Sequence, residues 1–129
     1  MNVLLWVLQV ALAIYFFFTG LIHFAVPPGL PAPMSWMYEL SAPLHYISGA
    51  AEILAAFGLI LPAATRIRPA LTPLAAAGLV LVMLLAALFH FPRGEYLNIV
   101  MNLVVGALAA FVAYGRSRLA PVRGRSSSA

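Results

Sequence analysis

The chain has 129 residues and a formal net charge of +4, and 64% of its residues are apolar while only 8% are charged. A soluble domain of this size needs about a quarter of its residues charged to cover its surface, so the composition predicts a one-domain membrane protein with no separate soluble module. The absence of cysteine excludes disulfides, thiolate catalysis and sulfur-ligated metals.

The first apolar stretch, residues 3–26, carries no charge and is long enough to cross a bilayer, which takes roughly 20 apolar residues. A cleaved signal peptide is the alternative. It is disfavoured because no Lys or Arg precedes the run and because the run is longer than a signal core. At helical spacing Gln9, Thr19, Gly20 and His23 lie on one face.

The next segment, residues 27–43, contains several prolines that forbid a continuous helix. It also contains Trp36 and Tyr38, whose rings suit the membrane–water interface. We expect a short interfacial segment that lies over the mouth of the bundle. An ordinary surface loop is the alternative.

A second predicted span, residues 44–61, ends at Pro62. Offsets of four and seven residues return to the same helical face, so His45, Gly49 and Glu52 form one stripe. Glu52 falls near the middle of the span, where a charge is costly and must face protein or water.

The third and fourth spans cover residues 70–91 and 97–114. His90 stands at the end of the third span, while Asn98 and Asn102 lie four residues apart on one face of the fourth. The sequence therefore predicts an all-α membrane protein, a bundle of four transmembrane helices in one domain covering residues 1–114.

Arginines are distributed unevenly between the two sides of this bundle. Four spans place both termini and the loop that holds Arg66 and Arg68 on one side, with six arginines, and leave only Arg93 on the other. The positive-inside rule then predicts a multi-pass protein with both termini in the cytoplasm. We expect residues 115–129, basic and Ser-rich, to be a disordered cytoplasmic tail. The basic balance thus indicates topology and not nucleic-acid binding.

Helix direction brings the polar side chains together in the outer half of the bundle. The predicted ligand-binding residues are His23, His45, Gly49, Glu52, His90, Asn98 and Asn102. Glu52 is the candidate for proton handling, and no other catalytic role is assigned. No His-x-x-x-His or Glu-x-x-His pair lies on one helix, so we predict neither a metal site nor a haem site.

Four short motifs carry a family resemblance: Gly20-Leu-Ile-His23-Phe24, Gly49-Ala-Ala-Glu52, Ala86 to His90, and Ala113-Tyr-Gly-Arg116. In this order and spacing, over residues 5 to 116, the chain resembles the DoxX-like family of small bacterial four-span membrane proteins. The resemblance implies a location in the bacterial plasma membrane. The family's Gly-x-x-Glu corresponds to Gly49 and Glu52, and many relatives carry Lys where this chain has His23.

The resemblance also implies candidate functions, because some relatives are linked to thiosulfate:quinone oxidoreduction or to a membrane complex that works beside superoxide dismutase and a sulfurtransferase. We expect a subunit of a membrane redox system that binds a quinone or a similar lipophile. An assembly factor or structural partner is the alternative, and a small transporter is a third. If Glu52 has only a structural role, it links transmembrane helices through a hydrogen bond with Asn102 or a histidine. Whether the chain is an enzyme, has a redox partner or forms a homo-oligomer stays open.

Overall fold

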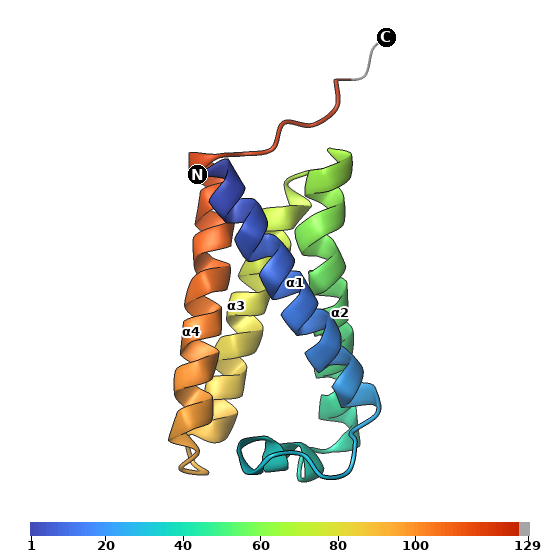
Figure 1. Cartoon of the computed structure of the whole chain (residues 1–129), viewed down its shortest axis with the longest axis vertical. Coiled ribbons are helices and arrows are strands. Elements are labelled where there is room, and N and C mark those ends of the chain that lie inside the picture. The colour runs from blue at the N-terminus through green and yellow to red at the C-terminus, as the bar shows by residue number, and fades with distance from the viewer. Residues whose placement is uncertain (127–129) are drawn as a thin grey trace.

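The computed structural model describes residues 1–126 as a bundle of helices (Figure 1). Its elements are α1 (Asn2–Phe24), η1 (Ala32–Tyr38), α2 (Ala42–Thr65), α3 (Leu71–His90), α4 (Tyr96–Tyr114) and η2 (Gly115–Leu119). Across residues 1–126 there is no strand, and four helices are long and apolar enough to cross a membrane. The predicted all-α class with four membrane-spanning helices is therefore confirmed.

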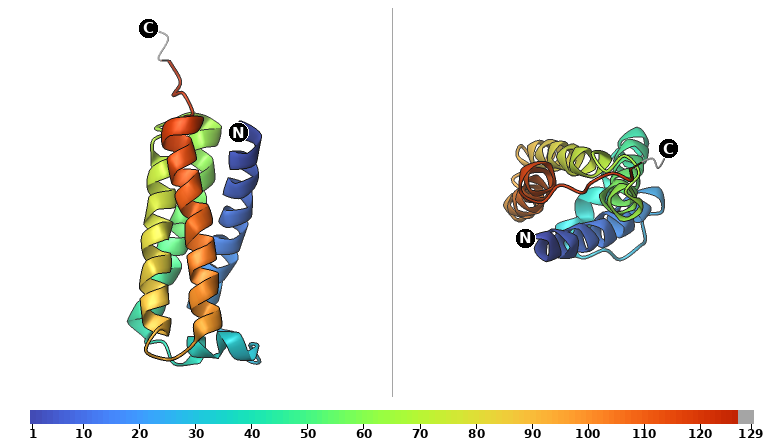
Figure 2. Two further views of the ribbon diagram at one scale, coloured as in Figure 1. Left: turned by 90° about the vertical axis from the view of Figure 1, so that its left-hand side faces the viewer. Right: turned by 90° about the horizontal axis from the view of Figure 1, so that it is seen from above.

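Consecutive helices run antiparallel and pack side by side, α1 with α2, α2 with α3 and α3 with α4. Helix α1 starts beside α4 and then leans across toward α2, so α1 and α4 have few contacts (Figures 1 and 2). We call the end with η1 and the 91–95 loop the cap end. The end with residues 1–6, 66–70 and 115–126 is the tail end. The 3₁₀ helix η1 crosses the cap end, so it lies over the mouth of the bundle.

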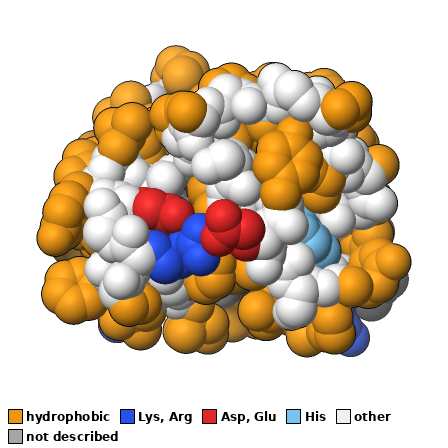
Figure 3. Space-filling view, turned by 90° about the horizontal axis from the view of Figure 1, so that it is seen from below, with side chains coloured by type: hydrophobic (Ala, Val, Ile, Leu, Met, Phe, Trp, Pro, Cys, Tyr) orange, Lys and Arg blue, Asp and Glu red, His pale blue; other side chains and the backbone are white. Residues whose placement is uncertain are grey.

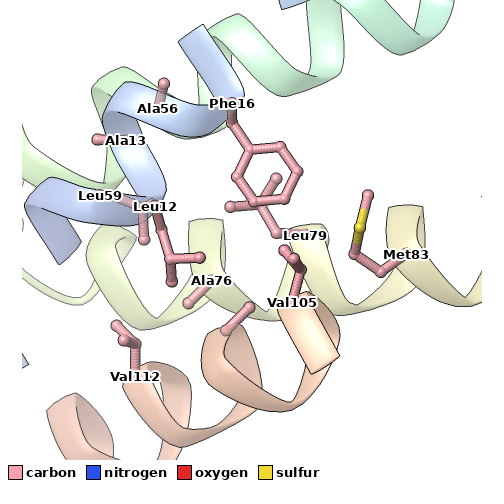
Figure 4. Close-up of a cluster of buried hydrophobic side chains, with 11 residues drawn as sticks. Leu12, Ala13, Phe16, Ala56, Leu59, Ala76, Leu79, Met83, Val105 and Val112 are labelled. Atoms are coloured by element: carbon pink, nitrogen blue, oxygen red, sulfur yellow. The ribbon is translucent and has the colours of Figure 1, made fainter. Parts of the chain in front are cut away.

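The centre of the bundle is an apolar cluster to which all four helices contribute (Figure 4). Its members are Leu12, Ala13, Phe16, Ala56, Leu59, Ala76, Leu79, Met83, Val105, Ala109 and Val112. The outside is equally apolar, with Val3 76% and Leu54 72% exposed. A helix that is hydrophobic on every side suits a lipid environment, because the bilayer covers the face that protein does not.

The prediction that the second span ends at Pro62 is wrong, because α2 continues through Pro62 to its last turn. A proline inside a helix has no N–H for the carbonyl four residues earlier, which here belongs to Gly58. The Thr72 hydroxyl of α3 donates to that carbonyl oxygen at 3.2 Å. The neighbouring carbonyl of Leu59 accepts from Gln9 Nε2 of α1 at 2.6 Å. Neighbouring helices thus compensate for the proline. All other predicted helix ends lie within two residues of the observed ones.

The tail is more ordered at its start than expected. Residues Gly115–Leu119 form the π-helix η2, and Arg116 is buried. The expectation of disorder from residue 115 onward is therefore wrong for this segment. Residues 120–126 have no regular structure, but the Arg125 amide donates to the Arg66 carbonyl oxygen at 3.0 Å. The part of the predicted tail at 127–129 lies outside the described residues.

Replacing Thr72 tests the compensation for the proline. Thr72→Val should lower the free energy of unfolding by about 1–3 kcal/mol, because the Gly58 carbonyl loses its donor in a buried place. In a Pro62→Ala background the loss should shrink, since residue 62 then supplies the missing N–H. The measurement is thermal melting in detergent. Thr65→Val is the control, because Thr65 is exposed and its hydroxyl bonds only to near neighbours in the sequence, the Leu61 carbonyl and the Ile67 amide. Equal losses in both backgrounds would contradict this account.

Candidate functional site

Two glycines bring the backbones of α1 and α2 into contact in the half of the bundle nearer the cap end, which we call the cap half. A Cβ atom added to Gly49 would lie 2.9 Å from the carbonyl oxygen of Gly20, 2.9 Å from His23 Cβ and 2.7 Å from the Phe24 ring. A Cβ on Gly20 would lie 3.3 Å from Glu52 Cβ. Small residues permit such close approach of membrane helices. The contact places the polar side chains of the two helices within bonding distance of one another.

A chain of buried polar contacts runs beside this crossing. Thr19 Oγ1 donates to Glu52 Oε2 at 2.7 Å, and Glu52 Oε1 lies 3.7 Å from His23 Nε2. His23 Nδ1 is 2.9 Å from His45 Nδ1, and His45 Nε2 is 2.8 Å from the carbonyl oxygen of Met37 in η1. We call Thr19, His23, His45 and Glu52 the histidine–glutamate network. It connects the middle of α2 to the cap.

The hydrogen bonds determine the tautomers of the two histidines. A carbonyl oxygen only accepts, so His45 Nε2 carries a proton toward Met37. A neutral His45 then accepts at Nδ1, and His23 donates from its own Nδ1. If His23 is neutral, its Nε2 has no proton and faces Glu52 Oε1 as one acceptor facing another.

A proton on either His23 Nε2 or Glu52 would remove this contact between two acceptors. On His23 Nε2 it gives an imidazolium beside a carboxylate, and on Glu52 it gives a neutral imidazole beside a carboxylic acid. Without it the Glu52 carboxylate, which is only 5% exposed, would be a buried and unpaired charge. The 3.7 Å separation is that of an ion pair and is longer than a hydrogen bond.

His90 is not part of this network. The Trp36 ring of η1 lies between His90 and His23. Its centroid is 6.1 Å from the centroid of the His23 ring and 5.0 Å from that of the His90 ring. His90 Nδ1 instead bonds Glu95 Oε2 at 2.5 Å. The three predicted histidines therefore lie in one region but in two separate sets of hydrogen bonds.

Glu95 belongs to a row of charges on the outer face of the cap end (Figure 3). Arg93 donates from Nε to Glu95 at 2.9 Å and from Nη2 to Glu39 at 2.5 Å, so it ties the 91–95 loop to η1. The hydrogen bond to Glu39 raises the pKa of Arg93 against the opposing effect of desolvation. Desolvation would raise the pKa of Glu95, but hydrogen bonds from His90 and Arg93 and their charges lower it below its ordinary value.

The two asparagines lie apart from the histidine–glutamate network. Asn98 lines an outer hollow of about 430 Å³ together with Ser35 and Gly94. The Asn102 amide nitrogen is buried and has no hydrogen-bond partner among residues 1–126. Glu52 bonds Thr19 rather than Asn102, because α4 lies diagonally across the bundle from α2. Of the predicted set, the structure brings together His23, His45, Gly49 and Glu52.

The sequence reasoning missed the parts of the site that come from loops and backbone. These are the Met37 carbonyl, the spacing role of Trp36, and Glu95 as the partner of His90. Glu95 follows His90 by five residues across a tight loop, which was a usable signal. A backbone carbonyl leaves no trace in residue types. Among residues 1–126, no group of three or more His, Cys, Asp or Glu side chains is arranged to hold a metal ion.

Comparison with known proteins identifies a family. The family model described as the DoxX-like family matches residues 7–112. The match covers all of the histidine–glutamate network and most of the four helices. No curated protein and no solved structure matches the chain.

Substituting Gly49 tests the helix contact that positions the network. Gly49→Ala should destabilise the bundle by about 1–3 kcal/mol, because the new methyl group meets the Gly20 carbonyl, which cannot move aside like a flexible side chain. Gly78→Ala is the matched control, since nothing lies within 4 Å of its added Cβ and alanine favours the helix by up to about 1 kcal/mol. Thermal melting in detergent measures both. An unchanged Gly49→Ala melting temperature would show that the helices do not meet here.

The lowered pKa of Glu95 predicts a pH-dependent contribution to the stability of the cap. A carboxyl group with a lowered pKa stabilises the fold above its ordinary value of 4.5, and this contribution disappears as the pH falls through the lowered pKa. Glu95→Gln should therefore melt earlier than the parent protein at pH 7, and the difference should vanish at pH values well below 4.5. A difference that is constant over this range would exclude a role for the Glu95 charge.

Proposed function

Since this chain belongs to the DoxX-like family, we propose that it is a proton-exchanging subunit of a membrane redox system that binds a quinone or a similar lipophilic carrier. The observation that carries this proposal is the buried contact of 3.7 Å between His23 Nε2 and Glu52 Oε1. A carboxyl group and an imidazole that exchange one proton are suited to general acid–base chemistry. Chains of Glu and His inside membrane helices commonly serve as proton relays.

The direction of the network supports proton exchange with the cap end. Seven residues separate His45 from Glu52, which corresponds to about 10 Å along the helix. His45 is buried beneath η1 at the cap end, while Glu52 and Thr19 lie deeper among the helices. With the tautomers given above, a proton can pass from Glu52 to His23 Nε2 while His23 gives its Nδ1 proton to His45. Transfer in the opposite direction requires His23 to carry its proton on Nε2 and to accept at Nδ1 from His45.

A quinone is the lipophile that this chemistry fits best. Its reduction to the quinol takes up two electrons and two protons, and it diffuses within the apolar layer where Glu52 lies. In this proposal a redox partner supplies the electrons, and the His23–Glu52 pair donates protons to the quinone one at a time. Each donated proton is replaced through His45. The chain itself contributes hydrogen bonds and protons to the carrier, and the carrier performs the redox step.

The charge distribution supports an orientation in the bacterial plasma membrane. Six of the seven arginines lie at the tail end, and Arg93 alone lies at the cap end. By the positive-inside rule the tail end with both termini faces the cytoplasm, so the histidine–glutamate network exchanges protons with the opposite side.

A second candidate function is that of an assembly factor or structural partner of another membrane protein. The observation that favours it is the exposure of the last helix: in the apolar stretch of residues Tyr96–Leu119 only 11% of the residues are buried, against 33% in that of α1. A helix that is so little covered by its own chain offers a surface to another span. In this reading Glu52 holds α1 and α2 together and exchanges no proton.

Glu52→Gln separates the two candidates. Glutamine keeps the size and the hydrogen bond with Thr19 but removes the titration. We expect the variant to insert and melt like the parent protein, yet to retain quinone about tenfold less well after gentle purification, a change of about 1.4 kcal/mol. It should also fail to complement the deletion phenotype. Quinone is measured by solvent extraction and absorption, and bound chains are measured by native mass spectrometry.

The control for this experiment is Glu39→Gln, which removes an exposed carboxylate outside the network. It should keep quinone and function. A Glu52→Gln protein that is stable and fully functional would end the proton-handling proposal. A stoichiometric partner chain with no quinone would favour the assembly role.

A further inference from the structure

A second polar region lies at the tail end, on the opposite side of the bundle from the histidine–glutamate network. A hollow of about 440 Å³ opens there between the first turns of α1, the last turn of α2 and the tail. The tail crosses this end of the bundle above α1 and α2 (Figures 1 and 2). Asn2, Trp6, Arg66 and Arg123 are among the residues that line the hollow.

No carboxylate side chain balances the arginines around this hollow. The chain has three acidic residues in all, Glu39, Glu52 and Glu95. Two of these form the charge row at the cap end with Arg93, and Glu52 lies in the cap half beside His23. The six arginines of the tail end therefore have no carboxylate side chain among residues 1–126 near them to balance their charge.

Arg116 is a buried cation directly behind the hollow. It is 3% exposed, and its guanidinium lies over the Trp6 ring at 5.3 Å. Its partners are all neutral: Nε donates to Gln9 Oε1 at 2.5 Å, and Nη1 donates to Asn2 Oδ1 at 2.6 Å and to the Ala120 carbonyl at 3.1 Å. Its Nη2 is buried without a hydrogen-bond partner among residues 1–126. A buried guanidinium with no anion is costly, so negative charge nearby is strongly favoured.

The fold holds this arrangement in place from two sides. Gly115 of η2 lies against the Leu5 side chain of α1, so closely that a Cβ atom on residue 115 would overlap it. This contact packs the start of η2 against α1. The Arg125 amide donates to the Arg66 carbonyl and keeps the tail over the end of α2. Asn2 and Trp6 contact Arg116 and also line the hollow, so the positive charge of Arg116 lies just behind its wall.

We infer that this hollow binds the phosphate group of an anionic phospholipid, with Arg66 and Arg123 as direct partners and Arg116 as the charge behind them. Guanidinium groups form strong charge-assisted bonds with phosphate oxygens. Basic pockets at the ends of membrane helices are suited to lipid headgroups, and Trp6 places the hollow at the depth where aromatic rings meet those headgroups. The inference does not depend on the proposed redox role.

The test measures lipid retention by the full chain. The protein is released from nanodiscs that contain equal amounts of phosphatidylglycerol and phosphatidylcholine, and bound lipid is counted by native mass spectrometry. We expect the parent chain to prefer phosphatidylglycerol. The Arg66→Gln/Arg123→Gln double variant should lose this preference by about fivefold for each arginine removed. Both positions are exposed, so the melting temperature should change little.

Arg68→Gln is the matched control. Arg68 lies in the same loop as Arg66 but does not line the hollow. Both residues have a left-handed backbone, with φ of 47° at Arg68 and 60° at Arg66. The lipid preference of the Arg68→Gln protein should stay within about twofold of the parent value. An equal loss in the Arg68→Gln protein, or no preference for phosphatidylglycerol in the parent chain, would overturn the inference. Displacement of the lipid by millimolar inorganic phosphate would assign the hollow to a soluble phosphate compound instead.

Discussion

The contact between Gly20 and Gly49 is the constraint on which the rest of the cap half depends. Because neither residue has a Cβ, the backbones of α1 and α2 approach until an added methyl group would overlap a carbonyl oxygen. Only at this separation can Thr19 reach Glu52 and His23 reach His45. In lipid, where burial of apolar surface does not drive helices together, such close packing and the hydrogen bonds that it permits supply much of the association.

The same logic explains how polar groups survive elsewhere in an apolar bundle. The carbonyls of Gly58 and Leu59 near Pro62 accept from Thr72 and Gln9, which come from two different neighbouring helices. Gln9 then accepts from Arg116, so the last turns of α2 and the tail are connected through one amide side chain. A buried polar group is costly only while it lacks a partner, and in this bundle the partner usually comes from the next helix.

The two ends of the bundle have opposite electrostatic character. The cap end pairs its charges internally, since Arg93 lies between two carboxylates and each histidine has a defined hydrogen-bond partner. The tail end has no carboxylate side chain beside its arginines. Proton exchange needs neighbouring groups that can donate and accept a proton, whereas anion binding needs uncompensated positive charge. The proposed roles of the two ends follow from this difference.

The sequence by itself determined the four spans, the family and the stripe of His45, Gly49 and Glu52, because length, hydropathy and helical period depend on local residue types. Only the tertiary structure decided that Trp36 separates His90 from His23, that Glu52 bonds Thr19 and not Asn102, and that Arg116 is buried. The physical reason is that lipid is as apolar as the core. In a membrane the hydrophobic pattern therefore does not show which face of a helix is turned inward, and the rotation of each helix is set by packing and hydrogen bonds with its neighbours.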